Sequence, residues 1–206
     1  MSIEIGLDSS YEGIKSINLI EWLMQEPPMT KTWSTTKETE RLCMEEKIMC
    51  EVKQKMTRGE KAEALFLEGY NCAQAVAIAF EDLHGIDRDT IARLSSSFGG
   101  GMGRLREVCG GVSGMFMVAG LLYGYDEPQA KEEKAEHYTR IQKLAEDFTK
   151  KNGSIVCREL LGLTEKKQAP TPEERTAEYY KKRPCKELVG MAAEIMENYI
   201  KEYPIG

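Results

Sequence analysis

The sequence lacks the features that mark a secreted, membrane-spanning or nucleic-acid-binding protein. The first residues, Met1-Ser2-Ile3-Glu4-Ile5, are acidic, whereas a secretory signal opens with a basic segment. The longest apolar stretch, residues 108–125, contains five glycines and is slightly shorter than the ~20 residues that a membrane span needs. A net charge of −6 over 206 residues argues against nucleic acid or an anionic membrane as a partner. We therefore expect a cytoplasmic protein with neither partner.

Alternating runs of β-branched residues are also missing, which argues against a β-sheet. Apolar residues recur at helical spacing instead, and Thr57, Asn71 and Asp87 stand where helix caps are expected. We predict an all-α protein, in which an N-terminal helical arm (residues 1–56) precedes a compact helical bundle (residues 57–206). The expected helices span 11–24, 35–56, 57–69, 71–85, 87–97, 109–123, 127–150, 155–161 and 185–203, with a loop over 164–172.

Two of the six cysteines, Cys43 and Cys50, lie in the arm. They are seven residues apart and so on roughly one face of a predicted helix. We favour burial or a contact between subunits for them. The alternative is a second thiol pair, or extra ligands that the arm brings to a site. The first arm helix, with Trp22, would expose apolar surface if it stood alone. A homodimer formed through the arm would cover that surface.

Four other cysteines each occur where a helix is expected to begin. They are Cys72, Cys109, Cys157 and Cys185. The first follows the cap residue Asn71, the second follows a glycine-rich loop (residues 99–103), and the last follows the basic stretch 181–184. A helix start offers unpaired backbone N–H groups and about half a positive charge, so a cysteine placed there tends toward thiolate. The pattern indicates sulfur chemistry.

The spacing of these cysteines excludes a local metal-binding knuckle. Structural zinc sites and most ferredoxin-type clusters use close C-x₂-C pairs, and the sequence has none. With only two histidines, neither of them near a cysteine motif, a cysteine–histidine nucleophile is also disfavoured. Any shared site must therefore be assembled by the fold from four separate helix starts.

Three uses of the four cysteines remain open. In the first, which we favour, they converge as ligands of an iron–sulfur cluster, with the backbone N–H groups of Gly110 and Gly111 donating to sulfur. In the second, pairs of them form a redox-active dithiol without metal. In the third, they are small buried hydrophobes of a helical interaction module. The nearby basic residues that would offset the charge of an anionic cluster are Arg104, Arg106, Lys182 and Arg183.

The glycines in this region have a second use, in close packing. The loop over residues 99–103 lacks the G-x-x-x-x-G-K-[ST] pattern of a phosphate-binding loop. Gly110 and Gly114 lie four residues apart on one helix face, which would let a neighbouring helix approach closely. Tight packing is the favoured interpretation.

The arrangement of these motifs resembles that of a known family. The segments 69–76, 98–103, 109–114 and 157–162, followed by Cys185, are similar to the redox-active family named for its C…GCAxxG…C…C cysteine pattern. The likeness extends over roughly residues 59–200 and departs from the family at Gly111, where the family has alanine. It implies a helical, redox-active protein with no settled substrate. Together with the favoured use of the cysteines, it leads us to expect electron transfer with a redox partner protein, either as an oxidoreductase or as an electron-transfer component.

Overall fold

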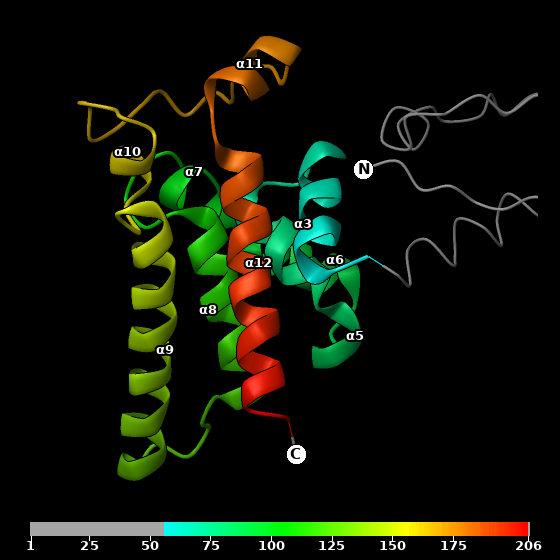
Figure 1. Cartoon of the computed structure of the whole chain (residues 1–206), viewed down its shortest axis with the longest axis vertical. Coiled ribbons are helices and arrows are strands. Elements are labelled where there is room, and N and C mark those ends of the chain that lie inside the picture. Colours follow the sequence, from blue (N-terminus) through cyan, green and yellow to red (C-terminus); the bar gives the residue numbers. More distant parts are fainter. Residues whose placement is uncertain (1–55, 206) are drawn as a thin grey trace, which may run out of the picture. The chain divides into compact units, whose positions relative to one another are not determined.

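The computed structural model describes residues 56–205, and these residues form the expected all-α fold (Figure 1). The described residues contain no β-strand, only one isolated antiparallel bridge between Val108 and Val156. The elements are α3 (Arg58–Leu67), α4 (Cys72–Ala79), α5 (Glu81–His84), α6 (Arg88–Ser95), the 3₁₀ turn η1 (Ser96–Phe98), α7 (Gly99–Met102), α8 (Gly110–Tyr123), α9 (Lys131–Asn152), α10 (Cys157–Leu160), α11 (Ala177–Lys182) and α12 (Cys185–Glu202). Predictions about the arm, including its helices, Cys43, Cys50 and the dimer contact, concern residues 1–55 and lie outside the described part.

The bundle is built around α12, which packs against α3, α4, α8 and α9. In Figure 1, α9, α8 and α12 run side by side, and α3 lies on the other side of α12 from α9. The core consists of the apolar faces of these helices, including Phe66, Val76, Met115, Phe148 and Met196, all fully buried. No helix in the described part of the chain is both long and apolar enough to cross a membrane.

The predicted helix starts are confirmed by their caps. Thr57 and Glu60 form a reciprocal capping box at the start of α3. The Asn71 side chain accepts hydrogen bonds from the backbone N–H groups of Ala73 and Gln74 at the start of α4. Asp87 caps α6 through the N–H of Thr90. These local interactions satisfy backbone donors that a helix start leaves free.

Several elements differ from the sequence prediction. The helix expected over residues 71–85 is interrupted at Phe80, which separates α4 from α5. The helix expected from residue 127 begins at Lys131 instead, because Ala130 N–H bonds to Glu127 O and closes a turn first. The helix α11 was not predicted; it begins after Thr176, whose hydroxyl accepts from the N–H of Tyr179.

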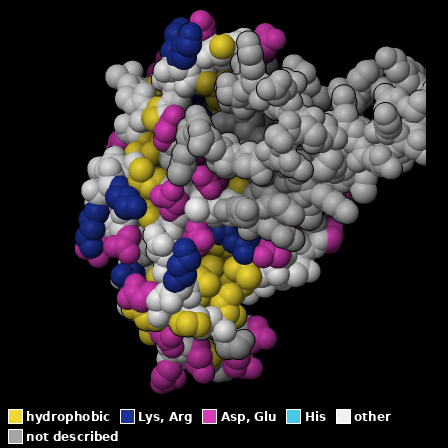
Figure 2. All heavy atoms as spheres, turned by 45° about the vertical axis from the view of Figure 1, so that its right-hand side comes forward, with side chains coloured by type: hydrophobic (Ala, Val, Ile, Leu, Met, Phe, Trp, Pro, Cys, Tyr) yellow, Lys and Arg dark blue, Asp and Glu magenta, His cyan; other side chains and the backbone are white. Residues whose placement is uncertain are grey.

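Three of the short elements, α7, α10 and α11, lie at one end of the bundle, which is the upper end in Figure 1. There α7, α10 and α11 lie near the first turns of α8 and α12. On the face drawn in Figure 2, basic and acidic side chains are intermixed over the described residues, with hydrophobic side chains between them. The end of the bundle with the short elements, by contrast, holds a concentration of cysteine and arginine.

Candidate functional site

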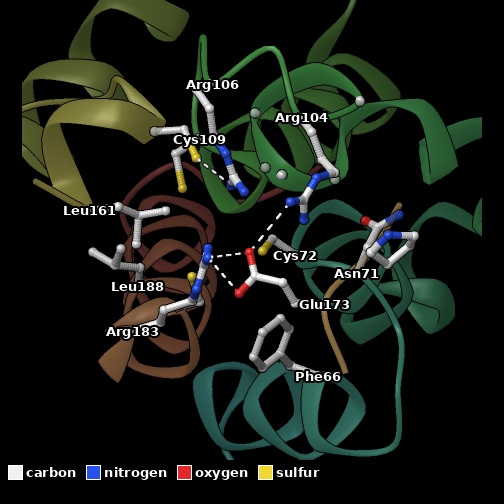
Figure 3. Close-up of a pocket in the computed structure, with 18 of the residues that line it drawn as sticks. Phe66, Asn71, Cys72, Arg104, Arg106, Cys109, Leu161, Glu173, Arg183 and Leu188 are labelled. Carbon is white, nitrogen blue, oxygen red and sulfur yellow. Dashed lines mark hydrogen bonds and ion pairs between the residues drawn. The ribbon is translucent and has the colours of Figure 1, made fainter. Parts of the chain in front are cut away.

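Four cysteines from four helix starts line one cavity of about 270 Å³ (Figure 3). Cys72, Cys157 and Cys185 are the first residues of α4, α10 and α12, and Cys109 is the residue that precedes α8. All four are free thiols; Cys109 and Cys157 are buried, and the other two are partly exposed. The expected convergence at helix starts is therefore what the fold produces.

Cys109 and Cys157 are held beside each other by backbone hydrogen bonds. The N–H of Cys109 donates to Ile155 O at 2.8 Å, and the N–H of Cys157 donates to Glu107 O at 2.6 Å. These bonds flank the isolated bridge between Val108 and Val156. Two residues 48 positions apart in the sequence are thereby fixed against each other by main-chain geometry rather than by side-chain packing alone.

Two glycines are required for the approach of the cysteine-bearing segments. A Cβ atom on Gly110 would lie 2.9 Å from the Cβ of Cys72, and one on Gly101 would lie 2.6 Å from the Cβ of Cys157. Gly101 also has φ +69°, a conformation that favours glycine. Gly114, one turn after Gly110, touches the backbone of α4 in the same way, with 2.7 Å from a built Cβ to Ala73 O. Close packing of α8 on α4 thus accounts for Gly110 and Gly114, and the approach of Cys157 accounts for Gly101.

Arginines surround the cavity. Those that line it are Arg104, Arg106, Arg175 and Arg183. Arg106 is 3% exposed, and its Nη1 donates to the Sγ of Cys157 at 3.6 Å. The backbones of Arg104 and Arg106 adopt left-handed φ values of 68° and 60°, which cost on the order of 1–3 kcal/mol each for a residue with a side chain. Such strain persists only where surrounding contacts enforce it, and it is typical of functional sites.

Cys72 and Cys185 form a hydrogen-bonded thiol pair. The hydrogen bond from Cys185 lowers the pKa of Cys72 to about 7, despite the opposing effect of burial. The N–H of Gly100 and the charge of Arg175 act in the same direction. The pKa of Cys185 is raised, first by this hydrogen bond and then by burial. The pair therefore loses its first proton near neutral pH, and Cys72 is the more acidic of the two thiols.

The other two cysteines keep their protons more strongly. Burial, followed by the proximity of Cys72, raises the pKa of Cys109 to about 12, although the N–H groups of Val112 and Gly111 oppose that rise. Burial also raises the pKa of Cys157, against the hydrogen bond from Arg106. One acidic thiol thus lies among three that stay protonated at neutral pH.

The predicted accessory residues are only partly in the cavity. Arg104, Arg106, Arg183 and Gly110 line it, whereas Lys182 and Gly111 are not among its lining residues. The Cα of Gly111 faces α12, where an added Cβ would lie 3.4 Å from Leu188 O. Its N–H nevertheless acts on the Cys109 thiol, whose pKa it lowers against the effect of burial.

The α10–α11 segment (residues 161–176) supplies a wall of the cavity that the sequence did not indicate. Gln168 accepts from Arg106, and its own N–H donates to Arg104 O at 3.2 Å. Arg175 donates to Phe66 O and Tyr70 O, at 2.6 and 3.0 Å, which joins the segment to the end of α3. Residues 164–172 of this segment were expected to be a loop. No motif in it signals these contacts, because they depend on long-range packing.

The described residues contain no group of three or more His, Cys, Asp or Glu side chains arranged around a single metal ion. What the fold defines is a helical protein with four free thiols and four guanidinium groups around one cavity. Residues 70–199 match the model of the family described as "Putative redox-active protein (C_GCAxxG_C_C)", and the chain belongs to this family. No curated protein and no solved structure gives a significant match.

Proposed function

We propose that the four cysteines bind an iron–sulfur cluster and that the protein transfers electrons through it. The observation that supports this most strongly is the meeting of Cys72, Cys109, Cys157 and Cys185 at one cavity. In both [2Fe–2S] and [4Fe–4S] clusters, four cysteines are shared among several irons. The cysteine sulfurs of such a site therefore surround a group of irons and do not need to meet around one ion.

The chemistry of the cavity suits an anionic group of this kind. Four thiolates around a cluster give a net negative charge, and the four lining arginines would offset it. The cavity is also lined by apolar side chains, Phe66, Leu160, Leu161 and Leu188, which limit the access of water. When bound, the cluster would take up and release single electrons.

The residues around the sulfurs would set the reduction potential. Arg106 donates to Cys157, the N–H of Gly100 to Cys72, and the N–H of Gly111 to Cys109. Hydrogen bonds to sulfur stabilise the more negative, reduced state, so they raise the potential. These donors belong to α7, to the loop that follows it and to the first turn of α8.

Anaerobic purification followed by iron and sulfide analysis and a visible spectrum tests the proposal. We expect iron and sulfide in stoichiometric amounts, and loss of most of the iron on replacing any one of the four cysteines by alanine. The double variant Cys43→Ala/Cys50→Ala is the control and should keep its iron. A colourless, iron-free protein after anaerobic reconstitution would count against the cluster.

A metal-free function is favoured by one specific observation, the hydrogen bond between Cys72 and Cys185. Here the Cys72 thiolate would attack a substrate disulfide, forming a mixed disulfide and releasing one substrate thiolate. Cys185, after losing its proton, would then attack Cys72, form the Cys72–Cys185 disulfide and release the second substrate thiolate. The protein dithiol loses two electrons and the substrate disulfide gains them. Thiol titration with mass mapping of a Cys72–Cys185 bridge in iron-free protein distinguishes this reaction from the first proposal.

A further inference from the structure

A carboxylate occupies the arginine-lined side of the cavity. Both oxygens of Glu173 lie close to Nη2 of Arg183, at 2.6 and 2.8 Å, and one of them is 3.3 Å from Nη2 of Arg104 (Figure 3). The two arginines come from distant parts of the chain, the loop after α7 and the residue before Pro184 and α12. Glu173 thus bridges two elements that flank the cysteines.

The charge balance of the cavity leaves room for a further anion. Glu173 is the one carboxylate among the described residues that line the cavity, against four arginines. Even with the Cys72 thiolate counted, positive charge is in excess. A cavity with walls of one sign concentrates anions from solution.

The two arginines are held independently of the carboxylate between them. Arg104 Nε donates to Ala169 O at 2.5 Å, and the Arg183 guanidinium lies over the ring of Tyr179 at 5.1 Å. The side chains of Arg104 and Arg183 are only 17% and 15% exposed, whereas that of Glu173 is 44% exposed. Arginine presents paired N–H donors that match the oxygens of carboxylates and other oxyanions.

We propose that Arg104 and Arg183 form a binding site for a small oxyanion or carboxylate ligand beside the cysteines, and that Glu173 occupies this site until the ligand displaces it. Glu173 then acts as a tethered competitor that lowers the affinity for anions. The site uses none of the cysteine sulfurs, and its positive charge is in largest excess when no anionic cluster is bound, as in the iron-free protein tested below.

Alkylation of Cys72 by two reagents of different charge tests the site. The probes are iodoacetate, which carries a carboxylate, and iodoacetamide, its neutral analogue; in both cases the thiolate forms an S–C bond and iodide leaves. The full chain is reduced, freed of iron with a chelator, and labelled at fixed ionic strength, with mass mapping of the modified cysteine. We expect Glu173→Gln to raise the rate with iodoacetate by about tenfold and to leave the rate with iodoacetamide unchanged.

Glu174→Gln is the matched control, since it removes the same charge one residue away and Glu174 is not a lining residue. It should leave the ratio of the iodoacetate rate to the iodoacetamide rate at the wild-type value. Arg183→Gln should lower the ratio, and inorganic sulfate should slow iodoacetate in Glu173→Gln more than in the wild type. An equal acceleration of both reagents would mean that the substitution only opens the α10–α11 segment, and it would overturn the proposal. An unchanged ratio in both Glu173→Gln and Glu173→Ala would overturn it as well, whatever the iron analysis shows.

Discussion

The Nη1 atom of Arg106 lies 3.6 Å from the Sγ atom of Cys157, and both residues are almost fully buried, with exposed fractions of 3% and 6%. A guanidinium is nearly always charged, so its burial is costly unless its donors are used. Arg106 also bonds to Gln168, which satisfies part of that need. The buried positive charge of Arg106 thus lies beside the sulfur of Cys157. This arrangement is expected of a site in which that sulfur becomes negatively charged.

The first prediction follows from this pair. Arg106→Gln removes a charged donor whose hydrogen bond and charge oppose the effect of burial, so the raised pKa of Cys157 should rise further. The pH dependence of Cys157 labelling by iodoacetamide, read by peptide mass, measures this shift. Arg93→Gln, on the exposed surface of α6, is the control. Arg106→Lys should restore part of the effect because it keeps the charge but loses the paired donors. An identical pH profile in Arg106→Gln would contradict the assigned role.

The second prediction concerns the thiol pair. The hydrogen bond from Cys185 is the largest cause of the low pKa of Cys72, about 7, so Cys185→Ala should shift the pKa of Cys72 upward toward its ordinary value of 9.0. At pH 7 the thiolate fraction, and with it the rate of labelling, should fall roughly tenfold or more. The midpoint of the pH profile is the measurement, because it does not depend on how easily the reagent enters. Cys157→Ala should leave the midpoint much closer to 7. A midpoint near 7 in Cys185→Ala would show that other groups set the acidity.

The third prediction is a loss of stability at alkaline pH. Cys109 has a folded-state pKa of about 12 against 9.0 for an ordinary thiol. Below pH 9 this thiol is protonated in both states and has no effect on the pH dependence. Between about pH 9 and 12 the unfolded chain has lost the proton and the folded chain has kept it, so stability falls as the pH rises. The slope from this group alone is about 1.4 kcal/mol per pH unit.

Urea unfolding of the reduced full chain at several pH values tests this slope. Cys109→Ala is compared with the wild type, since other alkaline groups titrate equally in both proteins. We expect the free energy of unfolding of Cys109→Ala to fall less steeply above pH 9. The low exposure of Cys109, 6%, indicates that its thiol is shielded from water. Parallel curves for the two proteins would contradict that shielding.

The fourth prediction uses two glycines with similar backbones and different surroundings. Gly101 and Gly103 have φ values of +69° and +63°, so alanine is strained at either position, by about 1 kcal/mol. Only at Gly101 would the new Cβ also meet the Cβ of Cys157, at 2.6 Å; at Gly103 the nearest atom is Ser97 O at 3.8 Å. Gly101→Ala should therefore cost at least about 2 kcal/mol in the free energy of unfolding and disturb Cys157 labelling. Gly103→Ala should cost about half as much and leave the labelling unchanged. Equal effects of the two substitutions would contradict this assignment.

The parts of the site that rest on local rules could be predicted from the sequence. The cap residue Asn71 places Cys72 at a helix start, and the glycine-rich loop upstream of Cys109 indicates a turn before the helix that this cysteine precedes. The glycines at 110 and 114 indicated close helix packing, and the contacts of α8 with α4 confirm it. The order of the motifs was enough to indicate the family.

The rest depended on contacts between residues far apart in the sequence. Glu173 and Arg175 lie in a segment without helical periodicity, and their partners, Arg183 and the carbonyls at the end of α3, are chosen by the tertiary fold. The sequence also did not indicate that Cys72 lies with Cys185 and Cys109 with Cys157. It arises from the short antiparallel bridge at Val108 and from the meeting of α4 with α12.

The position of the two partly exposed thiols has a mechanical consequence. Cys72 opens α4 and Cys185 opens α12, and these helices pack on each other within the bundle. A covalent bond between the two sulfurs would cross-link the early and late halves of the domain at a single point. Gaining or losing one pair of electrons would then change the rigidity of the whole bundle, and a partner that senses its stiffness could read the oxidation state without touching a sulfur atom.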